Sequence, residues 1–234
     1  MREIAVQSPA QSKEIFDYLK AGPILLDLGC VYALVALPTS SGKLGLDTLK
    51  IRLPGKNYGS MISDFALFIK ESDLDEAVKS TLLSPQNQNR LVGSFIRLPW
   101  KRSEELNAFT KNGTHQGLIV PEPIRSFCGK MENHFLEGKL NHSGFRRLIC
   151  TSANISGAPS GSITKLERAR IFGEERGVSL LVRFNLEANQ ETGSFPIFSI
   201  DNKGYVVERK GPKCLHFETQ LKSMGFSEVV QQRN

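Results

Sequence analysis

Apolar residues recur along this chain with two periods, and each period predicts a different kind of element. Ile15, Phe16 and Leu19 share one face at helical spacing, which predicts an amphipathic helix from Gln11 to Lys20. Short apolar runs bounded by glycine or polar residues predict buried strands instead. We expect such strands at 24–27, 31–37, 60–63, 91–98, 116–120, 148–151, 180–184, 197–201 and 205–209.

Helical patterns separate several of the expected strands. Ser40 and Ser41 are suitable N-caps for a helix from Gly42 to Ile51, because their hydroxyls can accept hydrogen bonds from the first backbone N–H groups. Further helices are expected at 73–83 and 123–136, and an Asn-Lys-Gly turn joins the last two strands. We therefore expect one α/β domain over residues 1–212, followed by a peripheral C-terminal helix or tail at 213–234.

The length and composition are those of a globular domain. Of 234 residues, 40% are apolar and 23% are charged, which argues against disordered, collagen-like or membrane-embedded classes. No apolar run is long enough to cross a bilayer, and the charged and polar N-terminus does not resemble a secretory signal. We therefore expect a cytoplasmic protein with no membrane partner.

The cysteines and histidines show no ligand spacing. No Cys-x-x-Cys pair occurs, and the histidines lack the spacing of a metal-binding pair. A disulfide framework and a structural metal are therefore not expected, and the thiols should be reduced and mostly buried. The residues concerned are Cys30, Cys128, Cys150, Cys214, His115, His134, His142 and His216.

Basic residues outnumber acidic ones. The formal net charge of +6 and the pI near 9.2 suit a partner that carries phosphates, although solubility alone also explains such a charge. Lys50, Arg52 and Lys56 cluster where the helix expected at 42–51 ends. Because exposed charges cost little, such a cluster is more often solvated than functional. The cluster alone leaves both interpretations open.

A polar loop follows the strand expected at 148–151. It reads Ser152-Ala153-Asn154-Ile155-Ser156-Gly157 and comes directly after Thr151. Loops rich in hydroxyl, amide and glycine groups at a strand end commonly hold ligands, although Ser152 and Asn154 could equally form a turn. No P-loop or Gly-x-Gly-x-x-Gly pattern occurs, so a bound nucleotide would be held in another way.

Together with three other segments, this loop resembles the YrdC-like family, which includes the threonylcarbamoyl-adenylate synthases and the YciO branch. The stretch from Ile149 to Ser160 nearly matches the family's Thr-Ser-Ala-Asn-Leu-Ser-Gly-x-Pro-Ser, and Lys50-Ile51-Arg52 matches its Lys-x-Arg. The resemblance covers about residues 10 to 212, and it implies an open, twisted, mixed sheet flanked by helices, with a concave basic face. The remaining matches are Val31-Tyr32-Ala33-Leu34 and the ending Asp201, Gly204, Arg209-Lys210-Gly211. The segment Arg52–Met61 looks closer to the YciO branch.

The resemblance also implies an activity. The synthases of the family join L-threonine, bicarbonate and ATP into threonylcarbamoyl-AMP and pyrophosphate, and the product modifies tRNA. By this resemblance Lys50 and Arg52 would be catalytic, because they can neutralise charge on the phosphates during adenylyl transfer. ATP would arrive with Mg²⁺. The nucleotide would be bound by Thr151, Ser152, Asn154 and Arg209, and the substrate by Tyr32 and Lys56.

Three departures from the synthase pattern fall in its threonine and ATP region. Asp27-Leu28-Gly29-Cys30 replaces Pro-Thr-Asp-Thr, Ile119 replaces an arginine, and Ile197 replaces a hydroxyl residue. Loss of hydrogen-bonding groups removes selectivity for a substrate hydroxyl. Three alternatives therefore stay open: a synthase or a relative with another small substrate, a YciO-like paralogue that binds ATP, AMP, tRNA or double-stranded RNA, and an inactive subunit of a larger complex.

Overall fold

The structure is a computed structural model that describes residues 1–8, 11–51, 57–100, 110–137, 145–157, 161–186 and 191–229. Helices and strands alternate along most of this part of the chain. They are β1 (Arg2–Ala5), α1 (Gln11–Ala21), β2 (Ile24–Asp27), β3 (Tyr32–Ala36), α2 (Ser40–Lys50), β4 (Gly59–Ile62), α3 (Phe65–Lys70), α4 (Glu76–Leu83), β5 (Phe95–Pro99), β6 (Thr110–Lys111), β7 (Thr114–Ile119), α5 (Ile124–Glu137), β8 (Ile149–Ser152), α6 (Leu166–Glu175), β9 (Leu180–Arg183), β10 (Ile197–Asp201), β11 (Gly204–Arg209) and α7 (Cys214–Ser223).

The elements expected from the sequence are confirmed with small shifts of their ends. Each expected strand overlaps an observed one, and the helices expected at 11–20, 42–51, 73–83 and 123–136 correspond to α1, α2, α4 and α5. The N-cap of α2 is Thr39 and not Ser40 or Ser41, because Thr39 Oγ1 accepts a hydrogen bond from the Gly42 N–H at 3.0 Å. The strand expected at 91–98 begins only at Phe95, because turns occupy the residues before it.

Four elements, β1, α3, β6 and α6, have no counterpart among the expected ones. β1 is a four-residue strand at the edge of the sheet, and only one of its side chains is buried. α3 has six residues, too few to show a helical period, and it begins where Asp64 Oδ1 accepts from the Leu67 N–H at 2.8 Å. α6 buries three of its residues along a narrow stripe. Hydrophobic periodicity does not detect elements this short or this exposed.

The strands form one mixed sheet in the order β1-β9-β2-β3-β8-β4-β7-β5-β10-β11, with β6 paired to β7. Neighbours are parallel in β1/β9, β9/β2, β4/β7 and β5/β10, and antiparallel elsewhere. At its centre β8 lies between β3 and β4, so that Ser152 pairs with Ala33 and Cys150 with Gly59. This pairing joins segments that are far apart in the sequence.

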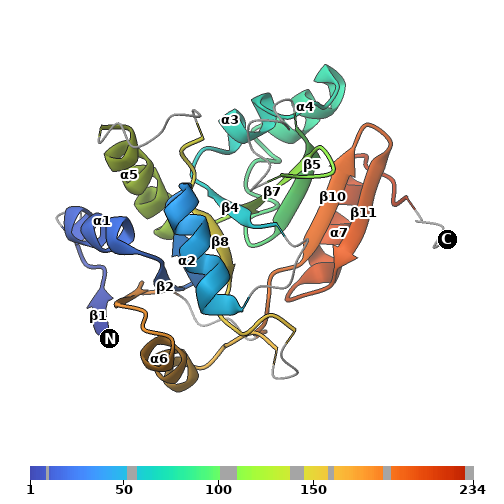
Figure 1. The fold of residues 1–234 in the computed structure, drawn as a ribbon. Helices are drawn as coiled ribbons and strands as arrows, with labels where there is room; N and C mark the ends of the chain where they lie inside the picture. The colour runs from blue at the N-terminus through green and yellow to red at the C-terminus, as the bar shows by residue number, and fades with distance from the viewer. Residues whose placement is uncertain are drawn as a thin grey trace.

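Helices cover both faces of the sheet (Figure 1). α1 and α5 contact each other and share one core with the sheet, in which Phe16 and Phe135 are buried. The other core contains residues of α2, α3, α4, α6 and α7, including Leu46 and Phe172. The predicted α/β class, with an open mixed sheet flanked by helices, is confirmed.

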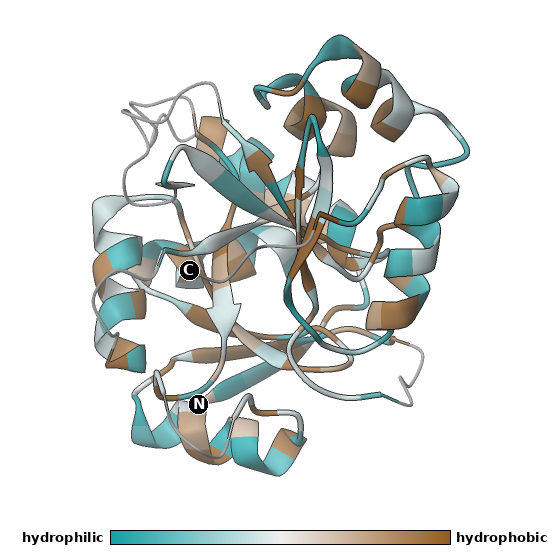
Figure 2. Cartoon of the chain, turned by 90° about the vertical axis from the view of Figure 1, so that its right-hand side faces the viewer, coloured by the Kyte–Doolittle hydropathy of each residue, from teal (hydrophilic) through white to brown (hydrophobic). Residues whose placement is uncertain are grey.

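Hydrophilic and hydrophobic positions are mixed along the helices, as Figure 2 shows. Such mixing is typical of helices that face a core on one side and solvent on the other. Among the described residues, no helix has both the length and the apolar character needed to cross a membrane. All four cysteines are buried and free, as the sequence predicted.

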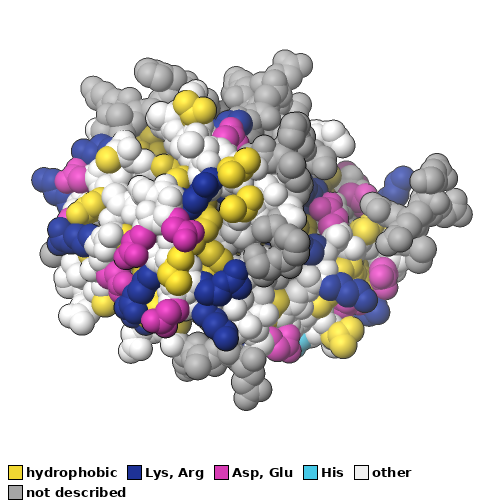
Figure 3. All heavy atoms as spheres, turned by 60° about the horizontal axis from the view of Figure 1, so that its bottom comes forward, with side chains coloured by type: hydrophobic (Ala, Val, Ile, Leu, Met, Phe, Trp, Pro, Cys, Tyr) yellow, Lys and Arg dark blue, Asp and Glu magenta, His cyan; other side chains and the backbone are white. Residues whose placement is uncertain are grey.

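Charges of both signs are mixed on the face drawn in Figure 3, where Lys and Arg lie beside Asp and Glu. Ion pairs between exposed side chains include Lys20 with Asp17, at 2.7 Å. Pairs of this kind contribute little to stability because water and salt screen them. Because both signs of charge are mixed there, the described residues of this face show no continuous basic patch despite the net charge of +6.

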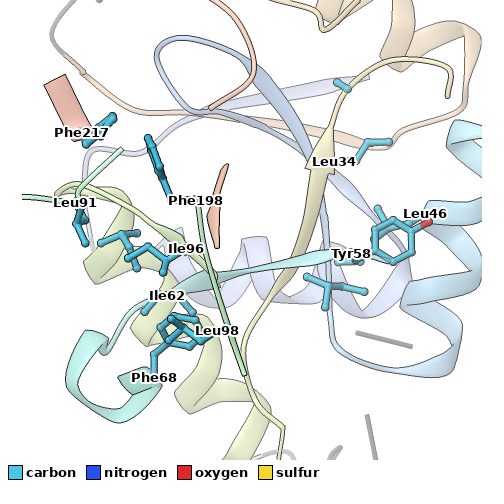
Figure 4. Close-up of a cluster of buried hydrophobic side chains, with 14 of the residues drawn as sticks. Leu34, Leu46, Tyr58, Ile62, Phe68, Leu91, Ile96, Leu98, Phe198 and Phe217 are labelled. Atoms are coloured by element: carbon cyan, nitrogen blue, oxygen red, sulfur yellow. The ribbon is translucent and has the colours of Figure 1, made fainter. Parts of the chain in front are cut away.

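One of the two cores is drawn in Figure 4. Tyr58 is buried there, and its hydroxyl donates to Asp47 Oδ1 at 2.5 Å. The C-terminal helix α7 belongs to this core, since Phe217 and Leu221 are buried against it. The helix expected after residue 212 therefore packs on the sheet. The labelled members are Leu34, Leu46, Tyr58, Ile62, Phe68, Leu91, Ile96, Leu98, Phe198 and Phe217.

Glu132 of α5 is a buried carboxyl group that should lower stability at neutral pH. It is 4% exposed, its Oε1 has no hydrogen-bond partner among the described residues, and Arg146 Nε lies 3.7 Å from its Oε2. Burial raises the pKa of Glu132 above its ordinary value of 4.5, against the opposing effects of Ser63, Arg147 and Arg146. The stability contributed by the protonated form is therefore present below pH 4.5 and lost as the pH rises through the raised pKa.

Replacing Glu132 by glutamine should therefore stabilise the protein at pH 8 and change little at pH 4. The gain at pH 8 should be about 1.4 kcal/mol for each pKa unit by which the folded value exceeds the unfolded one. Urea unfolding of both proteins across this pH range measures it. A difference in free energy of unfolding that does not vary with pH would contradict the assignment.

Candidate functional site

A cavity of about 460 Å³ opens near the centre of the sheet. Its walls come from β3, β4, β5, β7, β8, β10 and β11, from the end of α2 and from the loop after β8. Such a volume is within the range of small-molecule sites. The polar lining residues include Lys50, Asn57, Gln116, Thr151, Ser152, Asn154, Ser156, Ser162, Ser194 and Arg209.

Lys50 joins the end of α2 to the polar loop. The helix ends there because Ile51 adopts the left-handed conformation, with φ 49° and ψ 62°, which is unusual for a β-branched residue. Lys50 Nζ donates to the Ser152 carbonyl at 2.6 Å and to Asn154 Oδ1 at 2.7 Å. The Lys50 carbonyl accepts from the Ser156 N–H at 2.9 Å. The structure thus brings together Lys50 and the Ser-x-Asn pair.

The Ser-x-Asn pair positions the lysine. Ser152 Oγ donates to Asn154 Oδ1 at 2.9 Å, so this one amide oxygen accepts from both the serine and Lys50. Asn154 Nδ2 donates to the Ile155 carbonyl at 3.0 Å. Because Lys50 is only 3% exposed, these contacts fix the direction in which its ammonium group meets the cavity.

Arg209, at the end of β11, supplies the second cation. Its Nε and Nη2 donate to the Phe195 carbonyl at 3.1 and 2.6 Å, and its guanidinium lies over the Phe95 ring, 6.0 Å from the centroid. Arg209 is exposed as a whole residue, but burial of the guanidinium lowers its pKa. An arginine remains charged after such a change, because its ordinary pKa is above 12.

The charge of the cavity is positive in the part of the chain that the structure describes. Lys50 and Arg209 are its charged lining residues, and no aspartate or glutamate lines it there. Burial raises the pKa of Cys150, which also lines the cavity, to about 12, so this thiol is neutral near pH 7. The cavity is therefore suited to an anionic ligand.

Part of the wall is apolar, and two of the three departures from the synthase pattern contribute to it. Leu28 and Ile197 line the cavity, whereas Ile119 belongs to the core on the other side of the sheet. Successive side chains of a strand alternate between faces, so Leu118 lines the cavity in place of Ile119. Phe95 completes this apolar wall.

The structure does not bring every predicted site residue to the cavity. Tyr32, expected to bind substrate, packs into the core on the opposite face, while its neighbours Val31 and Ala33 line the cavity. The Tyr32 hydroxyl donates to Asp27 Oδ2 at 3.3 Å, and burial raises the pKa of Tyr32 to about 12. Strand alternation thus turns Tyr32 away from the cavity, and its role in substrate binding stays a prediction from the sequence. Arg52 and Lys56 lie outside the described residues.

Several lining residues were not predicted from the sequence. Gln116 of β7 lines the cavity, and Arg97 Nη2 donates to its Oε1 at 2.5 Å, which fixes the amide. Ser162 and Ser194 also line it and are joined by a short hydrogen bond between their hydroxyls. No local motif surrounds these residues, so only the pairing of distant strands reveals them. Within the described ranges, no group of three His, Cys, Asp or Glu side chains could hold a metal ion.

Comparisons with known proteins give a match in structure but none in sequence. No family model matches the chain, and no curated protein matches it. Sua5 of P. abyssi, solved with L-threonine, is similar with a TM-score of 0.64 at 14% identity, over 90% of this chain and 58% of Sua5. E. coli YciO is similar with a TM-score of 0.62 at 15% identity, over 89% of this chain and 93% of YciO.

A third similar structure is full-length HypF in its phosphate- and nucleotide-bound form, with a TM-score of 0.58 at 16% identity, over 86% of this chain and 29% of HypF. This chain therefore spans less than two thirds of the length of Sua5 and HypF. At such identities the likeness concerns the fold and not the activity. The sheet order, the two helical layers and these matches together show that the chain has the YrdC-like fold expected from its sequence.

Proposed function

We propose that the chain binds a nucleoside phosphate, ATP or AMP, in the cavity at the centre of the sheet. The observation that carries this proposal is that Lys50 and Arg209 both line the cavity, while no carboxylate occurs among its described lining residues. Two fixed cations in a partly dehydrated cavity attract phosphate oxygens more strongly than exposed ones do. The apolar wall near Phe95 and Leu118 offers a surface for a base.

The likeness to known structures supports this proposal. HypF is described in a phosphate- and nucleotide-bound form, and Sua5 in complex with L-threonine. The reaction we propose is adenylyl transfer, in which an oxygen of a carbamate or carboxylate attacks the α-phosphorus of ATP and pyrophosphate leaves. Lys50 and Arg209 would stabilise the negative charge that develops on the phosphates. Neither needs to act as a nucleophile, and Mg²⁺ would enter as part of the ATP substrate.

Threonylcarbamoyl-AMP synthesis is the specific activity that we propose to test first. Leu28 and Ile197 line the cavity where a synthase would have hydrogen-bonding groups, so we expect weak discrimination between threonine and amino acids without a hydroxyl. The expected result is pyrophosphate release from ATP that requires both bicarbonate and an amino acid. Calorimetric titration with AMP measures nucleotide binding separately.

The two measurements separate the parts of the proposal. AMP binding without pyrophosphate release would support the nucleotide site and contradict the synthase activity. Absence of AMP and ATP binding by the folded protein contradicts the proposed function as a whole. The same titration with other amino acids in place of threonine tests the expected loss of discrimination.

The second candidate function is binding of tRNA or double-stranded RNA, which the net charge of +6 favours. An RNA held through its phosphates releases counterions, so its affinity should fall steeply with added salt. If RNA reaches the cavity, Lys50→Ala should weaken RNA binding. Unchanged RNA affinity in that variant would separate RNA binding from the cavity.

A further inference from the structure

A second hollow, of about 400 Å³, lies between α4 and the end of α7 and shares no lining residue with the cavity. Its described lining carries hydroxyls, amides and one guanidinium, and it includes no carboxylate. Hydroxyl and guanidinium groups donate hydrogen bonds, so the hollow presents donors to a ligand. The polar residues used below are Ser80, Thr81, Ser84, Asn87, Arg90 and Ser223.

Arg90 is held in one orientation at this hollow. Its Nε donates to the Gln86 carbonyl at 3.0 Å, and its Nη1 donates to Ser223 Oγ at 2.7 Å. Ser223 Oγ in turn donates to the Gln220 carbonyl at 2.8 Å, which fixes the acceptor. Nη2 of Arg90 makes no hydrogen bond with any residue the structure describes. The N–H groups of Nη2 are therefore available to donate hydrogen bonds to a ligand.

Arg90 also differs from most of the arginines that the structure describes in having no acidic partner. Arg97 pairs with Glu208 at 2.9 Å, and Arg147 pairs with Glu71. No carboxylate of the described residues forms an ion pair with Arg90. Its positive charge is therefore not compensated locally.

Two hydroxyls beside Arg90 have no protein partner. Ser80 and Ser84 form no side-chain hydrogen bond within the described ranges, and both line the hollow. Asn87 is 6% exposed, and its Nδ2 donates to the Thr81 carbonyl at 2.7 Å, which fixes the turn that carries these groups. We propose that this hollow binds a phosphate group, with Arg90 donating through its fork and the serine hydroxyls completing the contacts. The phosphate can come from the free anion or from an RNA backbone.

The test follows the Arg90 Nε–H signal of the full chain by NMR during titration with inorganic phosphate at constant ionic strength. The signal is assigned by its loss in Arg90→Gln. We expect a saturable shift of this signal and no such shift for Arg168, an exposed arginine on α6, which lies far from α4 (Figure 1). Ser223→Ala should weaken phosphate binding about fivefold, because it releases the guanidinium. Absence of a phosphate-dependent shift in the folded protein overturns the proposal.

The source of the phosphate is distinguished with a short RNA duplex. If the hollow holds an RNA backbone, Arg90→Gln weakens duplex binding several-fold more than the matched Arg168→Gln does. If the two variants bind RNA equally while the phosphate-dependent shift persists in the wild type, the ligand is the free anion. A wild-type shift that Ser223→Ala leaves unchanged in size and affinity overturns the assigned role of Arg90. The outcome does not depend on the nucleotide cavity, because the readout is specific to Arg90.

Discussion

Replacing Lys50 by methionine is expected to weaken AMP binding by about 30-fold or more, because a buried, hydrogen-bonded cation contributes about 2 kcal/mol or more to an ion contact. Methionine keeps the length and apolar stem of the lysine but loses the ammonium group. The substitution removes the donor to the Ser152 carbonyl and Asn154 Oδ1, while Ser152 Oγ still donates to Asn154. Calorimetric titration with AMP measures the loss.

Lys43→Met is the matched control on the same helix. Lys43 forms an ion pair with Asp47 at 2.6 Å and does not line the cavity. We expect the affinity of the control for AMP to stay within about twofold of the wild type, since the pair is partly exposed and its loss is small. Equal losses of affinity in the two variants would show that Lys50 has no specific role. Melting curves establish that both variants are folded.

Replacing Gly211 by alanine is expected to destabilise the fold by about 3 kcal/mol and to weaken AMP binding together with it. A Cβ at this position would lie 2.3 Å from the Ser194 carbonyl oxygen and 2.7 Å from the Pro196 nitrogen. These are backbone atoms, so the 194–196 segment must move. That segment lines the cavity, and its Phe195 carbonyl holds Arg209.

Gly22→Ala is the control for this prediction. No atom lies within 4 Å of a Cβ built at Gly22, and we expect a change within about 1 kcal/mol there. Urea unfolding gives the stability of each variant, and titration with AMP gives its affinity. A Gly211→Ala protein of wild-type stability would show that the close approach of Gly211 to residues 194–196 is not required.

The two substitutions act on different cations of the cavity: Lys50→Met removes one directly, and Gly211→Ala disturbs the segment that positions Arg209. Lys50 is positioned by the loop after β8, and Arg209 by the segment against which Gly211 packs. Loss of AMP binding in both variants would support a ligand that spans the two cations. Loss only at Lys50 would place the phosphate at the end of the cavity formed by α2 and the β8 loop.

The sequence by itself determined most of the elements and several of the segments that form the site. The periods of apolar residues located most strands and helices, because burial of one face requires the same spacing wherever it occurs. The family resemblance singled out Lys50, the Ser152–Asn154 pair and Arg209, and all of them line one cavity. Gly211 was part of the matched ending, and the backbone contact at Ser194 gives the physical reason for a glycine there.

Only the tertiary structure decided which side of each strand faces the ligand. Alternation along a strand shows which residues share a face, but the choice of face depends on the partner strands and helices. Tyr32 and Ile119 therefore turned out to lie in the opposite core, and Val31, Ala33 and Leu118 line the cavity instead.

The tertiary structure also decided which distant groups meet. Gln116, Ser162 and Ser194 join the cavity only because β3, β8, β4, β7, β5 and β10 lie next to one another in the sheet. No spacing in the chain encodes that order, since strand pairing is settled by the packing of the whole core. The same reason explains why the hydrogen bond between Arg90 and Ser223 could not be predicted from the sequence.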